Sequence, residues 1–136
     1  MDAFISWPVL RRLPLIQPPG RAKIAAGRAG REMPAAPILL SSPRSAAAEA
    51  FRGLRTSLLL SSPDRQPKVI AIVSSLAAEG KTTVSVNLGI SFAQRGETVL
   101  LIDADLRRST IHAQFGLPPS RHGLSTVLTQ GINDRT

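Results

Sequence analysis

An eight-residue loop constrains this chain most, because it joins a run of strand character to a run of helix character. Residues 68–74 (KVIAIVS) are apolar on both faces and rich in β-branched side chains, which is typical of a strand buried in a parallel sheet. Residues 81–95 repeat apolar side chains at helical spacing, and Gly96 follows where a helix would end. Between them, residues 75–82 read SLAAEGKT. The sequence therefore predicts a strand, a glycine-containing loop and a helix in immediate succession.

This loop matches the phosphate-binding pattern G-x-x-x-x-G-K-[ST], with Ser75 in place of the first glycine. Backbone N–H groups and the positive end of the following helix suit phosphate, Lys81 suits the β- and γ-phosphates, and the Thr82 hydroxyl suits Mg²⁺. The alternative is an ordinary helix start, but the preceding strand favours phosphate binding, with ATP and Mg²⁺ as ligands. The predicted nucleotide-binding residues are Ala78, Glu79, Gly80, Lys81, Thr82 and Thr83.

A second strand is predicted at residues 98–102 (TVLLI), and two carboxylates follow it. Alternation along an extended chain puts Asp103 and Asp105 on one face, at the carboxyl end of the strand and beside the loop. One can hold Mg²⁺, and the other can orient or deprotonate an attacking hydroxyl. The alternative is a pair of aspartates in a solvated turn. The predicted catalytic residues are Lys81, Asp103 and Asp105, and the predicted metal ligands are Thr82, Asp103 and Asp105.

The two predicted strands and the helix between them form a right-handed βαβ unit. The predicted fold class is α/β, a P-loop NTPase with a Rossmann-like parallel sheet. Two strands are fewer than the roughly five that such a sheet has, so we expect the domain to be incomplete. Capping and turn residues predict further helices at 46–60, 110–115 and 124–128.

The first 44 residues differ from the rest in composition. They hold seven of the eleven prolines, which prevent long helices and central strands. Up to residue 45 there are seven basic and two acidic side chains, so +5 (7 − 2) of the net charge of +8 lies there. This basic segment has no run of aromatic side chains to stack on bases, so no nucleic-acid partner is expected. We predict a disordered or linker segment at 1–44 and the N-terminal part of a P-loop kinase or ATPase domain at 45–136.

Composition also excludes some classes of site. The chain has no cysteine, which excludes a disulfide framework and a thiolate metal site. No stretch reaches the ~20 uncharged apolar residues of a membrane-spanning helix, so membrane attachment is expected only through a partner or a further segment. His112 and His122 have no cysteine or carboxylate at metal-ligand spacing, and they are assigned no site.

The helix predicted at 46–60 carries a charge pattern. Glu49, Arg52 and Arg55 are three residues apart, so they fall on neighbouring positions of one helix face. Helix physics alone predicts an exposed charge pair there.

Three blocks of sequence together resemble the bacterial tyrosine kinases of capsular and exopolysaccharide biosynthesis and export. They are AEAFRGLRT (48–56), EGKTT (79–83) and LIDADLRR (101–108), in the family's order. The resemblance implies that the loop is a Walker A motif and that the two aspartates belong to a Walker A′ motif. It also implies an oligomerisation contact formed by Glu49, Arg52 and Arg55.

The same resemblance implies a function. The chain would be the ATP-binding part of a protein-tyrosine autokinase that regulates polysaccharide polymerisation and export at the cytoplasmic face of the inner membrane. The expected partners are ATP or ADP, further kinase subunits, and a membrane polysaccharide co-polymerase or activator protein.

The sequence departs from this family's pattern at three places. Ala77 and Ala78 stand where the family has proline and glycine, and Ser109 stands where proline follows the paired arginines. There is no Walker B strand and no tyrosine, so we expect little kinase activity from this chain alone. One alternative is a partitioning-type ATPase, although Ser75 and Leu76 occupy the positions of its extra lysine. Another is a non-catalytic fragment that binds nucleotide or docks on an intact kinase.

Overall fold

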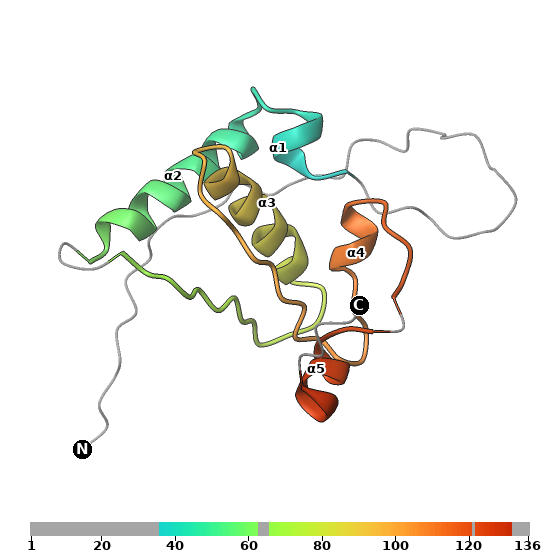
Figure 1. Ribbon diagram of the computed structural model, residues 1–136. Coiled ribbons are helices and arrows are strands. Elements are labelled where there is room, and N and C mark those ends of the chain that lie inside the picture. Colours follow the sequence, from blue (N-terminus) through green and yellow to red (C-terminus); the bar gives the residue numbers. More distant parts are fainter. Residues whose placement is uncertain (1–35, 63–65, 121, 132–136) are drawn as a thin grey trace, which may run out of the picture.

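The computed structural model describes residues 36–62, 66–120 and 122–131. Within them the chain forms the helices shown in Figure 1. They are α1 (Ile38–Ser41), α2 (Ala46–Leu60), α3 (Lys81–Ala93), α4 (Ile111–Gln114) and α5 (Leu124–Gln130). The helices predicted at 46–60 and 81–95, and the shorter ones near 110–115 and 124–128, are therefore confirmed.

The core lies between α2 and α3, with α1 against both (Figure 1). The Ser45 side chain accepts a hydrogen bond from Ala48 N and so caps the start of α2. The buried apolar cluster contains Leu39 from α1, Ala48 and Phe51 from α2, and Val86 and Ile90 from α3. Three helices thus share one small core, and α3 contributes to it directly behind the predicted phosphate loop.

The packed part of the chain begins earlier than the sequence suggests. Residues 1–35 of the predicted linker lie outside the described residues, but α1 lies inside its last part. Leu39 is only 1% exposed, and its N–H donates to the Asn87 side chain of α3 at 3.0 Å. Asn87, itself buried, also donates to Thr83 O at 2.8 Å. A short apolar turn after Pro37 is therefore held to α3 by a contact that spans 48 residues.

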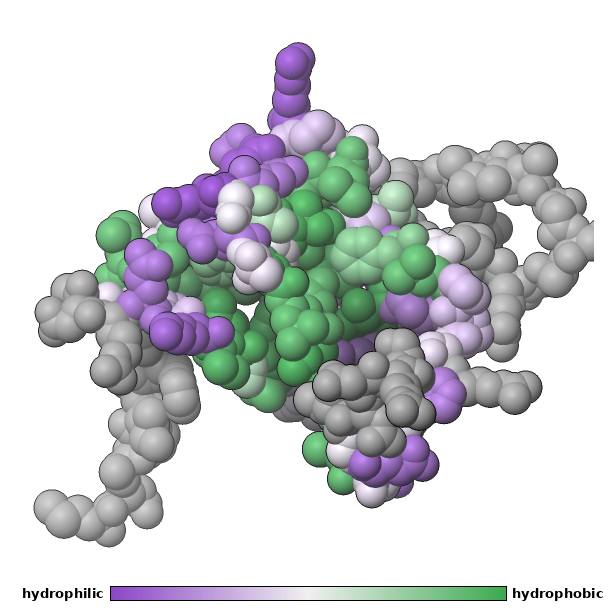
Figure 2. Space-filling model, in the orientation of Figure 1, coloured by the Kyte–Doolittle hydropathy of each residue, from purple (hydrophilic) through white to green (hydrophobic). Residues whose placement is uncertain are grey.

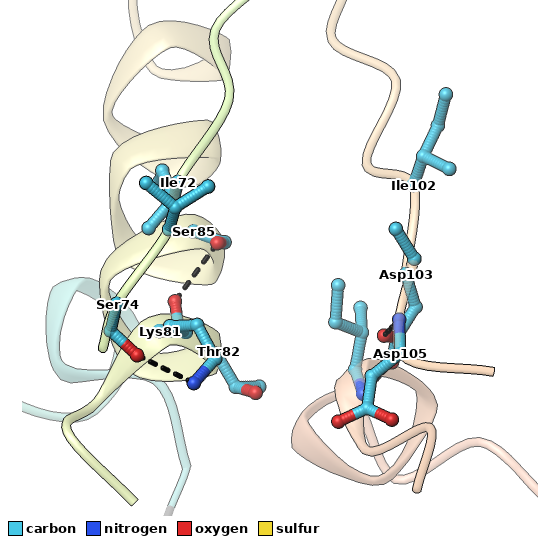
Figure 3. A pocket seen from close by; sticks show the side chains of 11 residues that line it. Ile72, Ser74, Lys81, Thr82, Ser85, Ile102, Asp103 and Asp105 are labelled. Carbon is cyan, nitrogen blue, oxygen red and sulfur yellow. Dashed lines mark hydrogen bonds between the residues drawn. The ribbon is translucent and has the colours of Figure 1, made fainter. Parts of the chain in front are cut away.

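The predicted parallel sheet is not formed in the described part of the chain. Residues 69–74 and 98–102 contain neither helix nor strand, and no backbone hydrogen bond joins the two segments. They lie on opposite sides of one pocket, with Ile72 on one wall and Ile102 on the other (Figure 3). A strand requires hydrogen bonds to a neighbouring strand, and these two segments do not meet. The predicted strands are therefore unpaired segments flanking α3.

Much apolar surface stays exposed as a result. The two segments present Val69, Val73 and Leu100 with 88%, 85% and 82% of their surface accessible. Figure 2 shows apolar side chains gathered over the centre of one face of the molecule. In contrast, Leu101 points the other way and packs against the core cluster, close to Gly89 of α3. Among the described helices, none is long and apolar enough to cross a membrane.

Candidate nucleotide-binding site

The loop before α3 contains two residues with positive φ angles. Gly80, the N-cap of α3, has a φ of 89°, and Ala78 has a φ of 62°. Both lie in the left-handed region, which glycine adopts freely and which costs alanine roughly 1–2 kcal/mol. These turns direct the chain into the first turn of α3, where unpaired N–H groups and the helix dipole favour negative charge.

The side chains of Lys81 and Glu79 make hydrogen bonds with other residues of the same loop. The Lys81 ammonium donates to Ser74 Oγ at 2.6 Å and to Leu76 O at 3.2 Å (Figure 3 shows the first contact). Glu79 Oε2 accepts from Leu76 N at 3.0 Å. That backbone hydrogen bond is the main reason the pKa of Glu79 lies below its usual value, and nearby Lys81 acts in the same direction. Lys81 is therefore held at the mouth of the loop by exposed contacts that an anion can replace.

Asp103 organises the segment that follows it. Its Oδ1 accepts from Asp105 N, and its Oδ2 accepts from Ser109 Oγ, Thr110 N and Ile111 N, at 2.9–3.1 Å. Partial burial raises the pKa of Asp103, but these hydrogen bonds outweigh burial and hold the pKa below its ordinary value. Asp103 thus fixes the start of α4 as an ionised carboxylate.

Asp105 makes fewer contacts. Its Oδ1 accepts from Arg107 N at 3.1 Å and Arg108 N at 2.9 Å, and its Oδ2 accepts no hydrogen bond from the described residues. The side chain is exposed and lies on the wall of the pocket (Figure 3). One oxygen of Asp105 therefore stays available for a cation or a hydroxyl.

The structure brings four of the predicted site residues to one pocket. This pocket has a volume of about 320 Å³, near the lower end of small-molecule sites, which begin at about 300 Å³. Lys81 and Thr82 line it from the start of α3, and Asp103 and Asp105 line it from the facing segment (Figure 3). Ala78, Glu79, Gly80 and Thr83 are outside its wall, in the loop and first turn of α3.

The oxygen ligands around this pocket fit Mg²⁺, which prefers hard oxygen donors and keeps several waters or phosphate oxygens. Thr82 offers a hydroxyl, and Asp103 and Asp105 offer carboxylates. No group of three or more His, Cys, Asp or Glu side chains that could hold a metal ion occurs in the described ranges. Waters or the phosphates of a nucleotide would have to complete the ligands of a magnesium ion here.

Two residues beside the site, Thr110 and Ser74, are not among the site residues predicted from the sequence. Thr110 Oγ1 lies 3.1 Å from Thr82 Oγ1, and Ser74 Oγ accepts from Lys81. Ser74 could have been found as the last residue of the predicted strand, directly before the loop. Thr110 is 28 residues from Thr82, and nothing in its local sequence marks it beyond its place before a helix.

The charged residues of α2 make contacts within the chain. Arg52 forms an exposed ion pair with Glu49 and donates to Pro43 O at 2.7 Å. Arg55 turns toward α3 and donates to Ser91 O at 2.6 Å. Burial, together with the charges of Arg95 and Arg52, lowers the pKa of Arg55. Arg55 therefore links α2 to α3 by a hydrogen bond, whereas Arg52 and Glu49 lie on the surface.

Comparison with known proteins shows what this part of the chain is similar to. Residues 70–123 match the family described as the CobQ/CobB/MinD/ParA nucleotide binding domain. The crystal structure of the chimerical protein CapA2B2 superposes with a TM-score of 0.59 at 33% sequence identity, covering 72% of this chain and 42% of that one. Residues 70–123 are therefore similar to part of a nucleotide-binding domain, and the solved structure supports a P-loop NTPase fold, although the described residues of this chain form no strand.

The named relatives are bacterial tyrosine-protein kinases. The tyrosine-protein kinase YwqD of Bacillus subtilis is 45% identical over 91 residues, which are 67% of this chain and 38% of YwqD. The tyrosine-protein kinase etk of Escherichia coli is 38% identical over 67% of this chain and 12% of its own length. The tyrosine-protein kinase CpsD of Streptococcus agalactiae is 38% identical over 60% of this chain and 34% of its own.

This chain is thus a homologue of bacterial tyrosine-protein kinases, and it spans less than two-fifths of the length of these relatives. The resemblance that the sequence motifs indicate is confirmed at that level.

Proposed function

We propose that this chain is the ATP-binding part of a protein-tyrosine autokinase that regulates capsular or exopolysaccharide polymerisation and export. The observation that carries the proposal is the single pocket lined by Lys81 and Thr82 on one side and by Asp103 and Asp105 on the other. Homology to kinases, rather than the pocket alone, supplies the reaction class.

The loop and α3 would bind the phosphates. Lys81 exchanges its contacts with Ser74 and Leu76 for the β- and γ-phosphate oxygens, and the first turn of α3 directs N–H groups at them. These contacts are exposed and few, so the exchange costs little. The backbone of this phosphate-binding loop and first turn would be shaped by the remaining predicted residues, Ala78, Glu79, Gly80 and Thr83.

The facing carboxylates would complete the site. Mg²⁺, when bound, neutralises charge on the phosphates. Thr82 and Asp105 are suited to contact the cation, directly or through water, while Asp103 holds the 103–111 segment in place. Asp105 is also suited to orient the attacking tyrosine hydroxyl and accept its proton. That hydroxyl must come from another chain or segment, since these 136 residues contain no tyrosine.

Assembly forms part of the proposal. Glu49 is exposed and Arg52 is partly exposed, and both are suited to contact further kinase subunits, whereas Arg55 acts mainly within the chain. A membrane polysaccharide co-polymerase or activator would place the complex at the cytoplasmic face of the inner membrane. The partitioning-type ATPase shares the same domain family, but the relatives reported above are kinases and favour phosphotransfer to tyrosine.

Calorimetric titration with Mg²⁺-ADP tests the nucleotide site, once circular dichroism has shown the helices to be formed. We expect saturable binding that Lys81→Met abolishes, because the variant removes the charge that faces the phosphates. Lys68→Met is the matched control, since Lys68 is exposed and outside the pocket, and it should bind like the wild type.

Two results would contradict the proposal. A folded chain that does not bind Mg²⁺-ADP has no working nucleotide site, and equal binding by Lys81→Met would show that the ligand lies elsewhere.

A further inference from the structure

Thr110 lies where it can act on the proposed magnesium site without being part of the sequence motifs. Its hydroxyl is 3.1 Å from the hydroxyl of Thr82, within hydrogen-bond distance, and either oxygen can be the donor. The two residues come from different elements, the first turn of α3 and the residue before α4. This contact joins Thr82, which lines the pocket, to the segment that contributes Asp103, Asp105 and Ile111 to the lining.

A threonine that binds a cation uses a lone pair of its oxygen, so its hydrogen must point away from the metal. In this structure the neighbouring hydroxyl oxygen available to accept that hydrogen belongs to Thr110. Accepting it would fix the torsion of the Thr82 hydroxyl and leave a lone pair of its oxygen free for a cation. An unconstrained hydroxyl would rotate among several orientations, of which few suit the ion.

Thr110 is itself held in place. Its N–H donates to Asp103 Oδ2 at 2.9 Å, and the N–H of Ile111 donates to the same oxygen at 3.1 Å. Ile111 packs against the core cluster, which anchors the segment. A continuous path therefore runs from the Asp103 carboxylate through the Thr110 backbone and hydroxyl to the hydroxyl of Thr82.

We infer that Thr110 is a positioning residue of the magnesium site, which orients the Thr82 hydroxyl and transmits to it the placement set by Asp103. This inference rests on the proposed function, because it assigns a role toward the cation of the same pocket. It also gives Asp103 an indirect part in cation binding, through the segment it organises.

The test compares ADP affinity with Mg²⁺ and with EDTA, using the full chain and five variants. Thr110→Val keeps the shape of the side chain and removes the hydroxyl. We expect it to reduce the enhancement of ADP affinity by Mg²⁺ about tenfold or more, as changes in residues that orient metal ligands do. Affinity in EDTA should stay at the wild-type value, because a phosphate contact does not need this hydroxyl.

The remaining variants separate positioning from a structural role. Thr110→Ser restores a hydroxyl and should restore most of the enhancement by Mg²⁺. Thr82→Val should lose the enhancement, and the Thr82→Val/Thr110→Val double variant should lose no more than Thr82→Val alone, because both remove one coupled interaction. Thr129→Val makes the same chemical change on α5, where Thr129 Oγ1 donates to Ser125 O outside the pocket, and should behave as wild type.

Each contrary result has a distinct meaning. Wild-type enhancement by Mg²⁺ in Thr110→Val, or an equal loss of affinity with Mg²⁺ and with EDTA, would overturn the positioning role while leaving the proposed nucleotide site intact. Additive losses in the double variant would also overturn it. Failure of the wild type to bind ADP under either condition would remove the proposed function and this inference with it.

Discussion

The two aspartates of this pocket have different roles, which their spacing in the sequence does not reveal. Asp103 and Asp105 share a face, but Asp103 accepts hydrogen bonds with both oxygens, whereas Asp105 uses only one. A carboxylate whose lone pairs are filled by N–H and O–H donors is less available to a cation. The sequence could place both aspartates at the site because they follow the motif, but their separate roles depend on donors up to eight residues away.

Acid should weaken the segment that Asp103 holds. The pKa of Asp103 lies below its value in an unfolded chain, about 3.9, so ionised Asp103 stabilises the fold above that pH. The contribution is lost as pH falls through the lower, folded-state pKa. We expect the urea midpoint to decline as the pH falls below about 5, and to decline less steeply in Asp103→Asn.

Glu97→Gln is the control for this titration. It removes a carboxylate from an exposed position for which the structure gives no hydrogen bond to the described residues, and it should keep the wild-type slope. An Asp103→Asn variant with the same pH dependence as the wild type would show that the Asp103 hydrogen bonds do not favour its ionised form.

At the scale of elements, helices were predictable and strand pairing was not. The helix at Ala46–Leu60 has its capping serine, its good helix formers and its stop within one stretch of sequence, so local rules suffice. The turn at Ile38–Ser41 is too short for a periodic signal and depends on Asn87 of α3. Apolar runs identify extended segments at 69–74 and 98–102, but hydrogen bonding requires a neighbour that the local pattern does not specify.

The Arg55→Ala variant should show which charged residue of α2 contributes to packing within the chain rather than to subunit contacts. The Arg55 guanidinium donates to Ser91 O, and its partly buried Nε has no hydrogen-bond partner among the described residues. Hydrogen bonds from charged groups contribute about 1.5–3 kcal/mol, so Arg55→Ala should destabilise the chain by roughly that amount in urea unfolding. Arg52→Ala should cost less than about 1 kcal/mol, because both contacts of Arg52, with Glu49 and with Pro43 O, are exposed.

This difference decides which variant tests subunit contacts. If Arg55→Ala loses stability and association together, the loss of association follows from the loss of packing, and only Arg52→Ala reports on the interface. Equal stability of Arg55→Ala and Arg52→Ala would show that the contact of Arg55 with Ser91 contributes nothing to the packing of α2 against α3.

At the scale of the whole molecule, the core is small for the apolar surface that surrounds it. Five buried side chains form the central cluster, while both extended segments expose large aliphatic side chains (Figure 2). Exposed apolar area on this scale marks a surface that associates with another protein or with a second copy. The match covers 38% of the length of YwqD and 34% of the length of CpsD.

The isolated chain should therefore bind the apolar dye ANS and self-associate as its concentration rises, which dye fluorescence and sedimentation equilibrium measure. Val69→Thr and Leu100→Thr should lower both signals, since these side chains are 88% and 82% exposed on the two extended segments. Leu60→Thr is the control, because Leu60 is 75% exposed but is the last residue of α2 and belongs to neither segment, and it should change neither signal. A chain that stays monomeric without binding ANS, or an equal effect of Leu60→Thr, would show that the unpaired segments are not the source of association. A decrease confined to the two segment variants would locate the associating surface on the edges that the predicted strands leave unpaired.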